Sequence, residues 1–268
     1  MTQDLMFIKL GGSLITDKRR ESTVRAGTLR LLAEELRQAL TEKPDLRLLL
    51  GHGSGSFGHW EASRYNTRAG VHFPTEWHGF SQVSAAASRL NRIVVDAFMR
   101  ADVPVLSLQP SASVAAEDGR IASLALAPIQ RALEVGIIPL IFGDVAFDSV
   151  RGGTILSTED LFFYLAPILR PRRILLLGNA PGVLDDQRQV ISLITPRTYP
   201  EVEPFLRGAG GVDVTGGMAD KVARMVALVA DVPGLEVRIF SGRDPENFKR
   251  ILLEPEAAIG TRICADAD

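Results

Sequence analysis

The chain has 268 residues, of which 46% are hydrophobic, so it can bury one large core, and we expect a single domain over residues 1–268. Its 30 basic and 32 acidic side chains leave a formal net charge of −2, which excludes a surplus of positive charge for nucleic acid or an anionic membrane. The single cysteine, Cys264, excludes an intrachain disulfide and a cysteine-based zinc cluster.

Short apolar runs that stop at glycine or proline predict buried β-strands. In chain order they are residues 6–10, 46–50, 103–108, 137–142, 174–177 and 237–240. Stretches with helical spacing lie between them, at residues 28–40, 80–99, 126–135, 159–169 and 218–229. This alternation predicts an α/β fold in which parallel strands are joined by crossover helices that cover both faces of the sheet.

Two local signals refine this outline. Ser157 and Asp160 have the spacing of a capping box, which predicts a helix start just after Leu156. The Arg-Pro-Arg-Arg segment at 170–173 predicts a hinge between an N-terminal lobe of about residues 1–170 and a C-terminal lobe of about 171–268.

Four of the predicted strands are followed by loops that contain glycine. Ligands of an open parallel sheet bind outside the carboxyl ends of its strands, so these loops are expected to share one ligand-binding edge. The loops are residues 11–13, 51–59, 143–144 and 178–182.

The first loop follows Lys9, a lone cation at the end of an apolar strand. Gly11 and Gly12 allow backbone amides to approach an anion closely, and a phosphate would fit there. The alternative is a lysine that extends to solvent before an ordinary turn. Lys18, in Thr-Asp-Lys, gives a weaker signal of the same kind.

The second loop, residues 52–59, is dense in glycine and hydroxyl side chains and ends at His59. It predicts a phosphate site in which His59 holds an anion, although a lone histidine is more often structural. The same loop fits G-x-G-x-x-G, which would indicate a dinucleotide-binding dehydrogenase. That alternative requires an acidic residue at the end of the next strand, and residues 72–76 do not resemble a strand. His72 and His78 lack the spacing of metal ligands, so no zinc site is expected.

Residues 213–221 place paired glycines and Lys221 at the start of an amphipathic helix, where an anion is favoured. A Gly-Lys-Ser or Gly-Lys-Thr motif is absent, so this is not a P-loop. The alternative is an ordinary capped helix with a solvated lysine. Asp160 could serve the helix dipole or hold two active-site lysines, and Asp144 could position phosphates or their magnesium.

Taken together, these motifs resemble the amino acid kinase family and, within it, the isopentenyl phosphate kinases. The resemblance spans most of the chain and rests on residues 8–13 with 16–18, 52–59, 142–145, 154–157 with 160–161, and 213–221. It implies an open, mostly parallel sheet in a three-layer αβα sandwich. The N-terminal lobe would bind a phosphorylated acceptor and the C-terminal lobe ATP with Mg²⁺, in a homodimer. The activity implied is ATP-dependent phosphorylation of isopentenyl phosphate.

The resemblance also implies roles for individual residues. Lys18 would stabilise the transferring phosphoryl group, and Asp160 would orient Lys9 and Lys221. The nucleotide would be contacted by Lys9, Gly11, Gly12, Ser13, Gly55, Asn179, Gly182, Gly216, Gly217 and Lys221. The phosphorylated acceptor would be held by Ser54, Gly55, His59, Gly143 and Asp144.

The sequence departs from the family pattern at two places. Ser54 stands where relatives have a third glycine, and residues 178–182 replace a loop that bears an aspartate, on the expected adenosine side. Three alternatives stay open: a kinase of a phosphonate such as fosfomycin, the dinucleotide-dependent oxidoreductase, and a catalytically silent nucleotide-binding protein. We expect a cytoplasmic protein, because the start of the chain lacks a signal-peptide pattern and no apolar run approaches ~18 residues.

Overall fold

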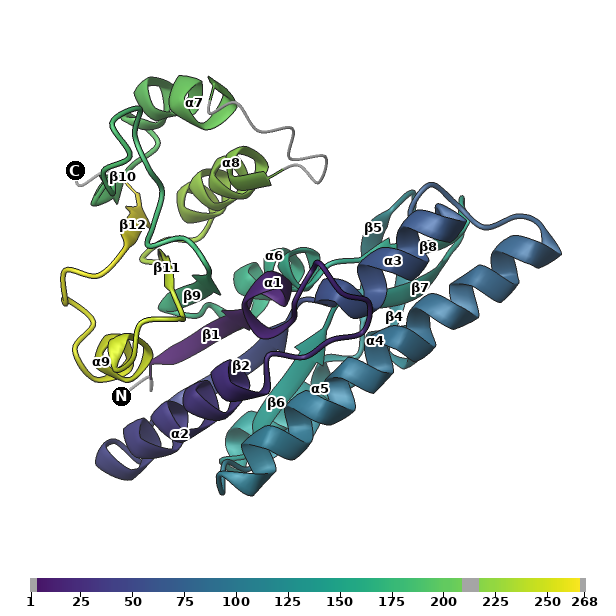
Figure 1. The fold of residues 1–268 in the computed structure, drawn as a ribbon, viewed down its shortest axis with the longest axis horizontal. Helices are drawn as coiled ribbons and strands as arrows, with labels where there is room; N and C mark the ends of the chain where they lie inside the picture. The colour runs from purple at the N-terminus through teal and green to yellow at the C-terminus, as the bar shows by residue number, and fades with distance from the viewer. Residues whose placement is uncertain (1–3, 209–216, 266–268) are drawn as a thin grey trace.

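The computed structural model describes residues 4–208 and 217–265, apart from the side chains of His59 and Arg207. Its main feature is a sheet of eight strands in the order β10-β12-β11-β9-β1-β2-β6-β3 (Figure 1). Neighbouring strands run parallel except β11 and β12. The strands are β1 (Leu5–Leu10), β2 (Arg47–His52), β3 (Val105–Ser107), β6 (Ile138–Phe142), β9 (Arg173–Gly178), β10 (Leu193–Ile194), β11 (Glu236–Ser241) and β12 (Thr261–Cys264). The expected α/β class is confirmed.

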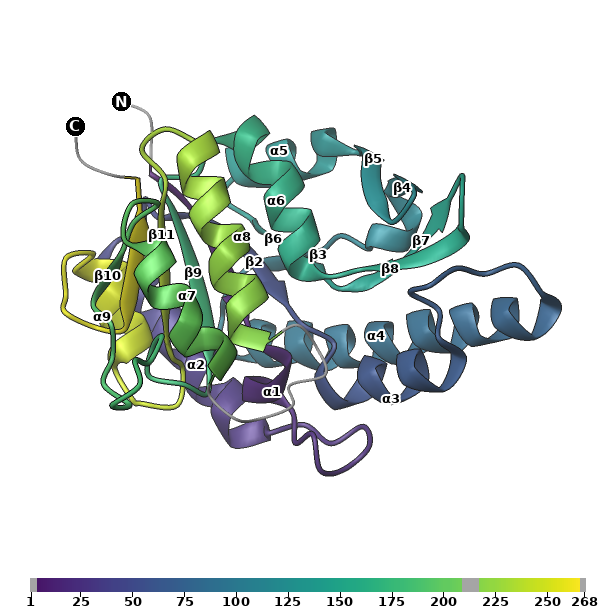
Figure 2. The ribbon, with the colours of Figure 1, turned by 90° about the horizontal axis from the view of Figure 1, so that it is seen from above.

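Helices cover both faces of this sheet, as Figure 2 shows from above. The core on one face is built with α1 (Gly12–Ile15), α2 (Ala26–Glu42), α4 (Pro74–Arg100) and α9 (Asn247–Leu253). The core on the other face is built with α5 (Leu126–Glu134), α6 (Thr158–Leu169), α7 (Tyr199–Gly208) and α8 (Gly217–Asp231). The predicted three-layer αβα arrangement is therefore present.

The central strand β1 shows why the apolar runs predict buried strands. Successive side chains of a strand point to opposite faces, and every residue of β1 is buried. Met6 and Ile8 belong to the first core, whereas Leu5 and Phe7 belong to the second. A strand covered on both faces needs apolar residues throughout, which removes the alternation typical of a half-exposed strand.

A second sheet, which the apolar runs did not predict, extends from one end of the molecule. Its order is β5-β4-β7-β8, with β4 (Val114–Glu117), β5 (Arg120–Leu124), β7 (Asp144–Asp148) and β8 (Gly152–Leu156). The two hairpins are joined by the buried carboxylate of Asp148, which accepts hydrogen bonds from the backbone N–H groups of Asp118, Gly119, Val150 and Arg151. These bonds lower the pKa of Asp148, although burial alone would raise it.

The glycine-rich second loop also contains structure that was not predicted. Residues 55–65 form α3 (Gly55–Tyr65), so the helix begins inside the stretch expected to be a loop. Residues 72–76 lie at the start of α4, and the next strand along the chain is β3. The dinucleotide-binding interpretation therefore lacks the strand that should carry its acidic residue.

The predicted hinge does not interrupt the sheet. Arg170 ends α6 in a left-handed conformation, and Arg173 is already the first residue of β9. Strand β9 pairs with β1 on one side and β11 on the other, so a single sheet contains strands from both expected lobes. The division of ligands between the two lobes stays a prediction.

Candidate active site

The four glycine-containing loops meet at one edge of the main sheet, as predicted. Three backbone hydrogen bonds join the loops to neighbouring strand ends. Gly11 N donates to Leu177 O (2.8 Å), Gly53 N donates to Leu10 O (3.0 Å), and Gly143 N donates to His52 O (3.3 Å). The ends of β9, β1, β2 and β6 thus present their loops side by side.

Gly12 and Gly55 form the tightest contact at this edge. A Cβ atom on Gly12 would lie 2.5 Å from Gly55 N, and one on Gly55, whose φ is +50°, would lie 2.2 Å from Thr16 Oγ1. Thr16 Oγ1 donates to Gly12 O (2.7 Å) and accepts from Ser56 N (2.9 Å). The first turns of α1 and α3 are therefore interlocked, and the N-terminus of α3 lies where an anion would be favoured.

Lys9, the buried cation at the end of β1, forms an ion pair with Glu159 in the first turn of α6. Burial would raise the pKa of Glu159, but the charges of Lys9 and Lys221 outweigh it and lower that pKa. The carboxylate therefore stays ionised between a lysine from β1 and a lysine from α8. Lys9 also adjoins the second loop, because a Cβ on Gly53 would lie 4.0 Å from Lys9 Cε.

The prediction that Asp160 holds Lys9 is wrong by one residue, because the acid that pairs with Lys9 is its neighbour Glu159. Asp160 serves the capping box: its carboxylate accepts from Ser157 N (2.8 Å) and Ser157 Oγ (2.7 Å). Adjacent side chains of a helix point about 100° apart, so a carboxylate turned back to cap the helix cannot also face Lys9. The capping-box spacing was visible in the sequence and could have identified Glu159 as the available acid.

Asp160 has a second role, because it joins α6 to α8. Arg224 Nη2 donates to Asp160 Oδ1 (2.6 Å), and the Arg224 guanidinium lies 4.3 Å from the centre of the Phe163 ring. Lys221 and Arg224 are three residues apart and so share a face of α8. The first turn of α6 thus engages α8 through the Asp160–Arg224 pair, on the face of α8 that also carries Lys221.

The comparison with known families decides what this arrangement is. The model of the "Amino acid kinase family" matches residues 4–241. The chain belongs to the amino acid kinase family.

Several proteins similar to this chain are named isopentenyl phosphate kinases. The isopentenyl phosphate kinase of Methanocaldococcus jannaschii is 32% identical over 81% of this chain and 85% of its own. That of Haloferax volcanii is 36% identical over 84% and 89%. A solved structure described as isopentenyl phosphate kinase has a TM-score of 0.80 at 29% identity and covers 97% of this chain and 99% of its own. The resemblance seen in the motifs is confirmed.

Behind the second loop, this amino acid kinase contains a buried polar chain. His52 stacks on Phe142 with ring centres 5.5 Å apart. Its Nδ1 lies 3.2 Å from Gly53 O, its Nε2 lies 3.2 Å from Asn91 Oδ1, and Asn91 Nδ2 donates to Ser107 Oγ (2.6 Å). Burial lowers the pKa of His52 from its usual 6.5 to about 4, so the ring is neutral at physiological pH.

This lowered pKa predicts a loss of stability on mild acidification. The unfolded chain takes up a proton near pH 6.5 and the folded chain only near pH 4, so stability falls as the pH drops through this window, by about 3 kcal/mol in total. His52→Gln is expected to flatten that part of the profile, measured by urea unfolding between pH 7 and 4. The exposed His78→Gln serves as the matched control, because it removes a histidine outside this buried polar chain. Equal slopes in the parent and His52→Gln would contradict a neutral buried His52.

The structure also describes most of the other predicted site residues. Lys18 is exposed in the loop between the bridged residues Thr16 and Val24, and that loop is tied to α3 because Thr23 N donates to Ser56 Oγ (3.2 Å). Gly217 begins α8 with φ +39°. Ser54 packs against Gly58, whose Cβ would lie 2.6 Å from Ser54 Cβ. Gly216 and the side chain of His59 lie outside the described residues.

Asp144 is buried and holds a neighbouring loop. Its carboxylate accepts from Val145 N (2.8 Å), Ser111 N (3.3 Å) and Gln109 Nε2 (3.3 Å). These contacts order the connection between β3 and β4, which contains the short 3₁₀ helix η1 (Pro110–Ala112). In residues 4–208 and 217–265, no group of three His, Cys, Asp or Glu side chains is placed to hold a metal ion.

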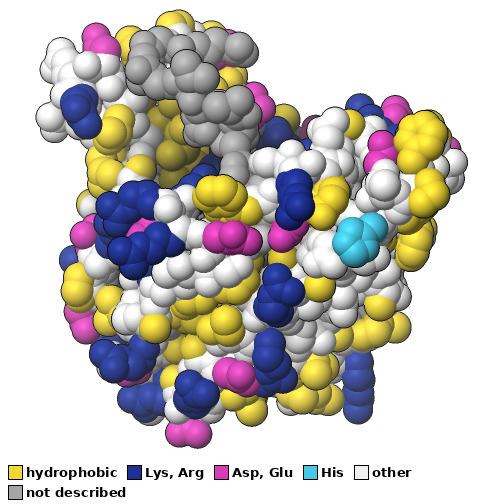
Figure 3. Space-filling view, turned by 45° about the vertical axis from the view of Figure 1, so that its right-hand side comes forward, with side chains coloured by type: hydrophobic (Ala, Val, Ile, Leu, Met, Phe, Trp, Pro, Cys, Tyr) yellow, Lys and Arg dark blue, Asp and Glu magenta, His cyan; other side chains and the backbone are white. Residues whose placement is uncertain are grey.

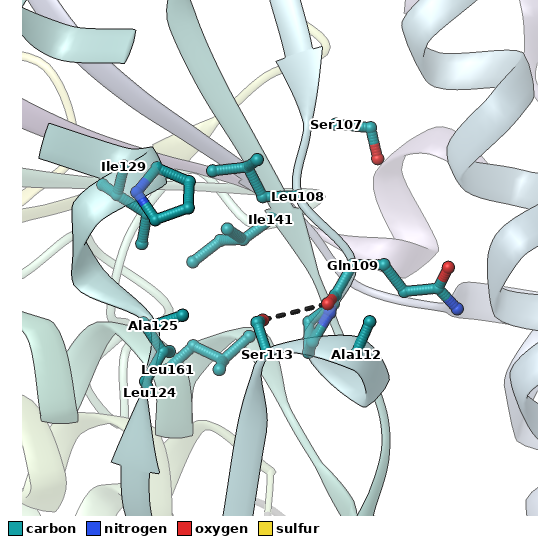
Figure 4. A pocket seen from close by; sticks show the side chains of 12 residues that line it. Ser107, Leu108, Gln109, Ala112, Ser113, Leu124, Ala125, Ile129, Ile141 and Leu161 are labelled. Atoms are coloured by element: carbon teal, nitrogen blue, oxygen red, sulfur yellow. Dashed lines mark hydrogen bonds between the residues drawn. The ribbon is translucent and has the colours of Figure 1, made fainter. Parts of the chain in front are cut away.

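A cavity of about 180 Å³ lies beside this loop, between α5, α6 and the end of β6 (Figure 4). Its walls are mostly apolar, and none of the predicted site residues lines it. The lining residues are Ser107, Leu108, Gln109, Pro110, Ala112, Ser113, Leu124, Ala125, Pro128, Ile129, Ile141 and Leu161. The glycine-containing loops, Lys9 and Lys221, and not this cavity, therefore form the candidate site.

The surface agrees with the low net charge of this amino acid kinase. Figure 3 shows basic and acidic side chains interspersed over one face, without a continuous basic area there. Among the described helices, none combines the length and apolar character needed to cross a membrane.

Proposed function

We propose that this protein transfers the γ-phosphoryl group of ATP to isopentenyl phosphate, giving isopentenyl diphosphate and ADP. The observation that carries the proposal is the Lys9–Glu159 pair, with Lys221 beside it, at the edge where the backbones of Gly12 and Gly55 meet. Two lysines and closely spaced backbone amides suit two neighbouring polyanions. The choice of isopentenyl phosphate as acceptor follows the relatives, which are named isopentenyl phosphate kinases.

The proposed reaction needs no catalytic base. The acceptor phosphate has a second pKa near ~6, so at neutral pH an ionised oxygen is available to attack the γ-phosphorus. As that bond forms, the bond from the γ-phosphorus to the β-bridging oxygen breaks, and ADP leaves. Positioning and charge neutralisation then carry the catalysis, and these are what Lys9, Lys221 and the glycine loops provide.

The remaining proposed roles rest on the family resemblance. Lys18 would reach the transferring group from its exposed loop, and His59 would donate a hydrogen bond to the acceptor phosphate. Bound Mg²⁺ would neutralise charge on the nucleotide phosphates. The described residues offer no acidic cluster for it, so the phosphates themselves would supply most of its ligands. We also propose a cytoplasmic homodimer, supported by the resemblance and, for the compartment, by the single cysteine.

An apolar acceptor tail would lie against a small hydrophobic cluster between α4 and β7. Val71, Phe80, Val83 and Val145 form this cluster, with Trp77 partly buried against it. The ring centres of Trp77 and Phe80 are 5.3 Å apart. Because Val145 follows Gly143 and Asp144 closely, the cluster adjoins the expected acceptor phosphate. Met99, near the other end of α4, is 51% exposed and does not belong to the cluster.

An ADP-release assay with Mg-ATP tests the proposal. Isopentenyl phosphate and dimethylallyl phosphate should give ADP, whereas fosfomycin, acidic amino acids and UMP should not. A response only to one of the latter three would overturn the acceptor and leave the kinase fold intact. Binding of Mg-ATP without ADP release with any acceptor would instead indicate a silent nucleotide-binding protein. Mg-ATP, and not NAD(H), should raise the melting temperature.

A further inference from the structure

Arg243, a residue that the motifs did not include, lies at the ligand-binding edge. It follows β11 directly, and the preceding Gly242 N donates to Gly178 O (3.0 Å). The loop after β11 therefore adjoins the loop after β9, which in turn adjoins Gly11. This adjacency of strand ends is not visible in the sequence, because β9 and β11 are separated by two helices.

Two hydrogen bonds through the side chain of Asn179 connect Arg243 to the loop at residues 11–13. Arg243 Nε donates to Asn179 Oδ1 (2.8 Å), and Asn179 Nδ2 donates to Ser13 O (3.0 Å). The amide thus connects a cation in the loop after β11 with the loop that follows Lys9. Among the residues that the structure describes, only Nε of the guanidinium is engaged, so there both terminal amino groups keep their N–H donors.

The charge of Arg243 is not balanced by a nearby acid. Within the described ranges 4–208 and 217–265, no carboxylate pairs with its exposed guanidinium. Arginines at exposed positions often have no partner, but this one is held by its hydrogen bond to Asn179 at the ligand-binding edge. A planar guanidinium with two free amino groups matches the geometry of a phosphate.

We infer that Arg243 binds the non-transferred phosphates of the donor nucleotide, an inference that rests on the proposed kinase function. The strand order β11-β9-β1-β2-β6 places Arg243 on one side of β1 and the acceptor loops after β2 and β6 on the other. Arg243 therefore faces the nucleotide half of the edge. An arginine there adds a cation to Lys9 and Lys221 without approaching the acceptor phosphate.

The neutral amide of Asn179 is essential to this arrangement. It accepts from Arg243 and donates to Ser13 O at the same time, which a carboxylate cannot do. An aspartate at this position would repel the Ser13 carbonyl and neutralise the guanidinium. The departure at residues 178–182 is thus coupled to Arg243: the uncharged residue leaves a cation available for the phosphates.

Titration calorimetry with Mg-ATP and with adenosine, in the absence of any acceptor, tests the role of Arg243. Arg243→Gln is expected to weaken Mg-ATP binding about tenfold and to leave adenosine binding unchanged, because a charge-assisted contact to phosphate is lost. The matched control is Arg37→Gln, which removes an exposed cation from α2 and should change neither affinity. Asn179→Asp should also weaken Mg-ATP binding, because its carboxylate competes for the guanidinium.

Two outcomes would overturn the inference. Parent-like Mg-ATP affinity in Arg243→Gln would show that the phosphates do not contact this residue. An equal loss for Mg-ATP and adenosine would show that Arg243 only fastens Asn179 and the loop. A parent protein that binds no Mg-ATP would contradict the proposed function itself, so the two failures are distinguishable.

Discussion

Glu159→Gln is expected to lower kcat for isopentenyl phosphate phosphorylation by about 10²- to 10³-fold, the range typical when a preorganised electrostatic contact is lost. The carboxylate pairs with Lys9, and the charges of Lys9 and Lys221 together lower its pKa despite burial. A neutral amide of the same shape leaves two lysines that repel each other, so neither stays where the phosphates need it. Steady-state kinetics with both substrates measures the effect, which should appear mainly in kcat.

The neighbouring substitution Asp160→Asn provides the matched control. It loses charge at the next residue of the same helical turn, where the carboxylate contacts Ser157 and Arg224. Weakening a cap and a partly buried ion pair should cost about 1–2 kcal/mol of stability and reduce kcat much less than Glu159→Gln does. A larger loss of kcat in Asp160→Asn than in Glu159→Gln would restore the original assignment of Asp160.

The difference between these two acids shows where sequence reasoning stops. The motif spacing places an acid at the start of α6, and the structure places one there in contact with Lys9. Which of two adjacent carboxylates faces the lysine depends on the rotation of the helix about its axis. The capping box fixes that rotation, because Asp160 turns back onto Ser157. The capping-box spacing in the sequence was therefore sufficient to assign Asp160 to the cap and Glu159 to Lys9, whereas the family resemblance alone pointed to Asp160.

The fold was predictable where burial dictates composition. β1, β2, β6 and β9 are covered on both faces, so their sequences are mostly apolar and contrast with the polar loops. The second sheet lacks that signal, because its strands mix buried and exposed residues and Phe147 is 60% exposed. Its two hairpins are linked through Asp148, whose bonds to Val150 and Arg151 are local but whose bonds to Asp118 and Gly119 join residues about 30 positions apart.

The site was predictable at strand ends that carry glycine or lysine. Lys9, Gly12 and Gly55 belong to motifs within short segments, and the parallel order of the strands brings these segments together. Arg243 has no such motif. Its placement depends on β11 pairing with β9 and on the contact between Asn179 and Ser13, both of which join residues far apart in the chain.

Gly12→Ala is expected to reduce kcat/KM for both substrates by at least about a hundredfold, the scale associated with displacing reacting groups by about 1 Å. The added Cβ would lie 2.5 Å from Gly55 N and 2.7 Å from Gly55 Cα. These are backbone atoms, so the clash cannot be relieved by turning a side chain. The two loops must separate, which also costs about 1–3 kcal/mol of stability.

Gly27→Ala separates this effect from a general intolerance of added methyl groups. Gly27 lies in α2, and a Cβ there would meet no atom within 4 Å. Alanine favours the helix over glycine by up to about 1 kcal/mol, so this variant should melt at or slightly above the parent temperature with unchanged kinetics. If Gly12→Ala behaved like Gly27→Ala, the close approach of the two loops could not be what holds the phosphates. The kinetic contrast between two identical chemical changes therefore tests whether the Gly12–Gly55 contact forms the site.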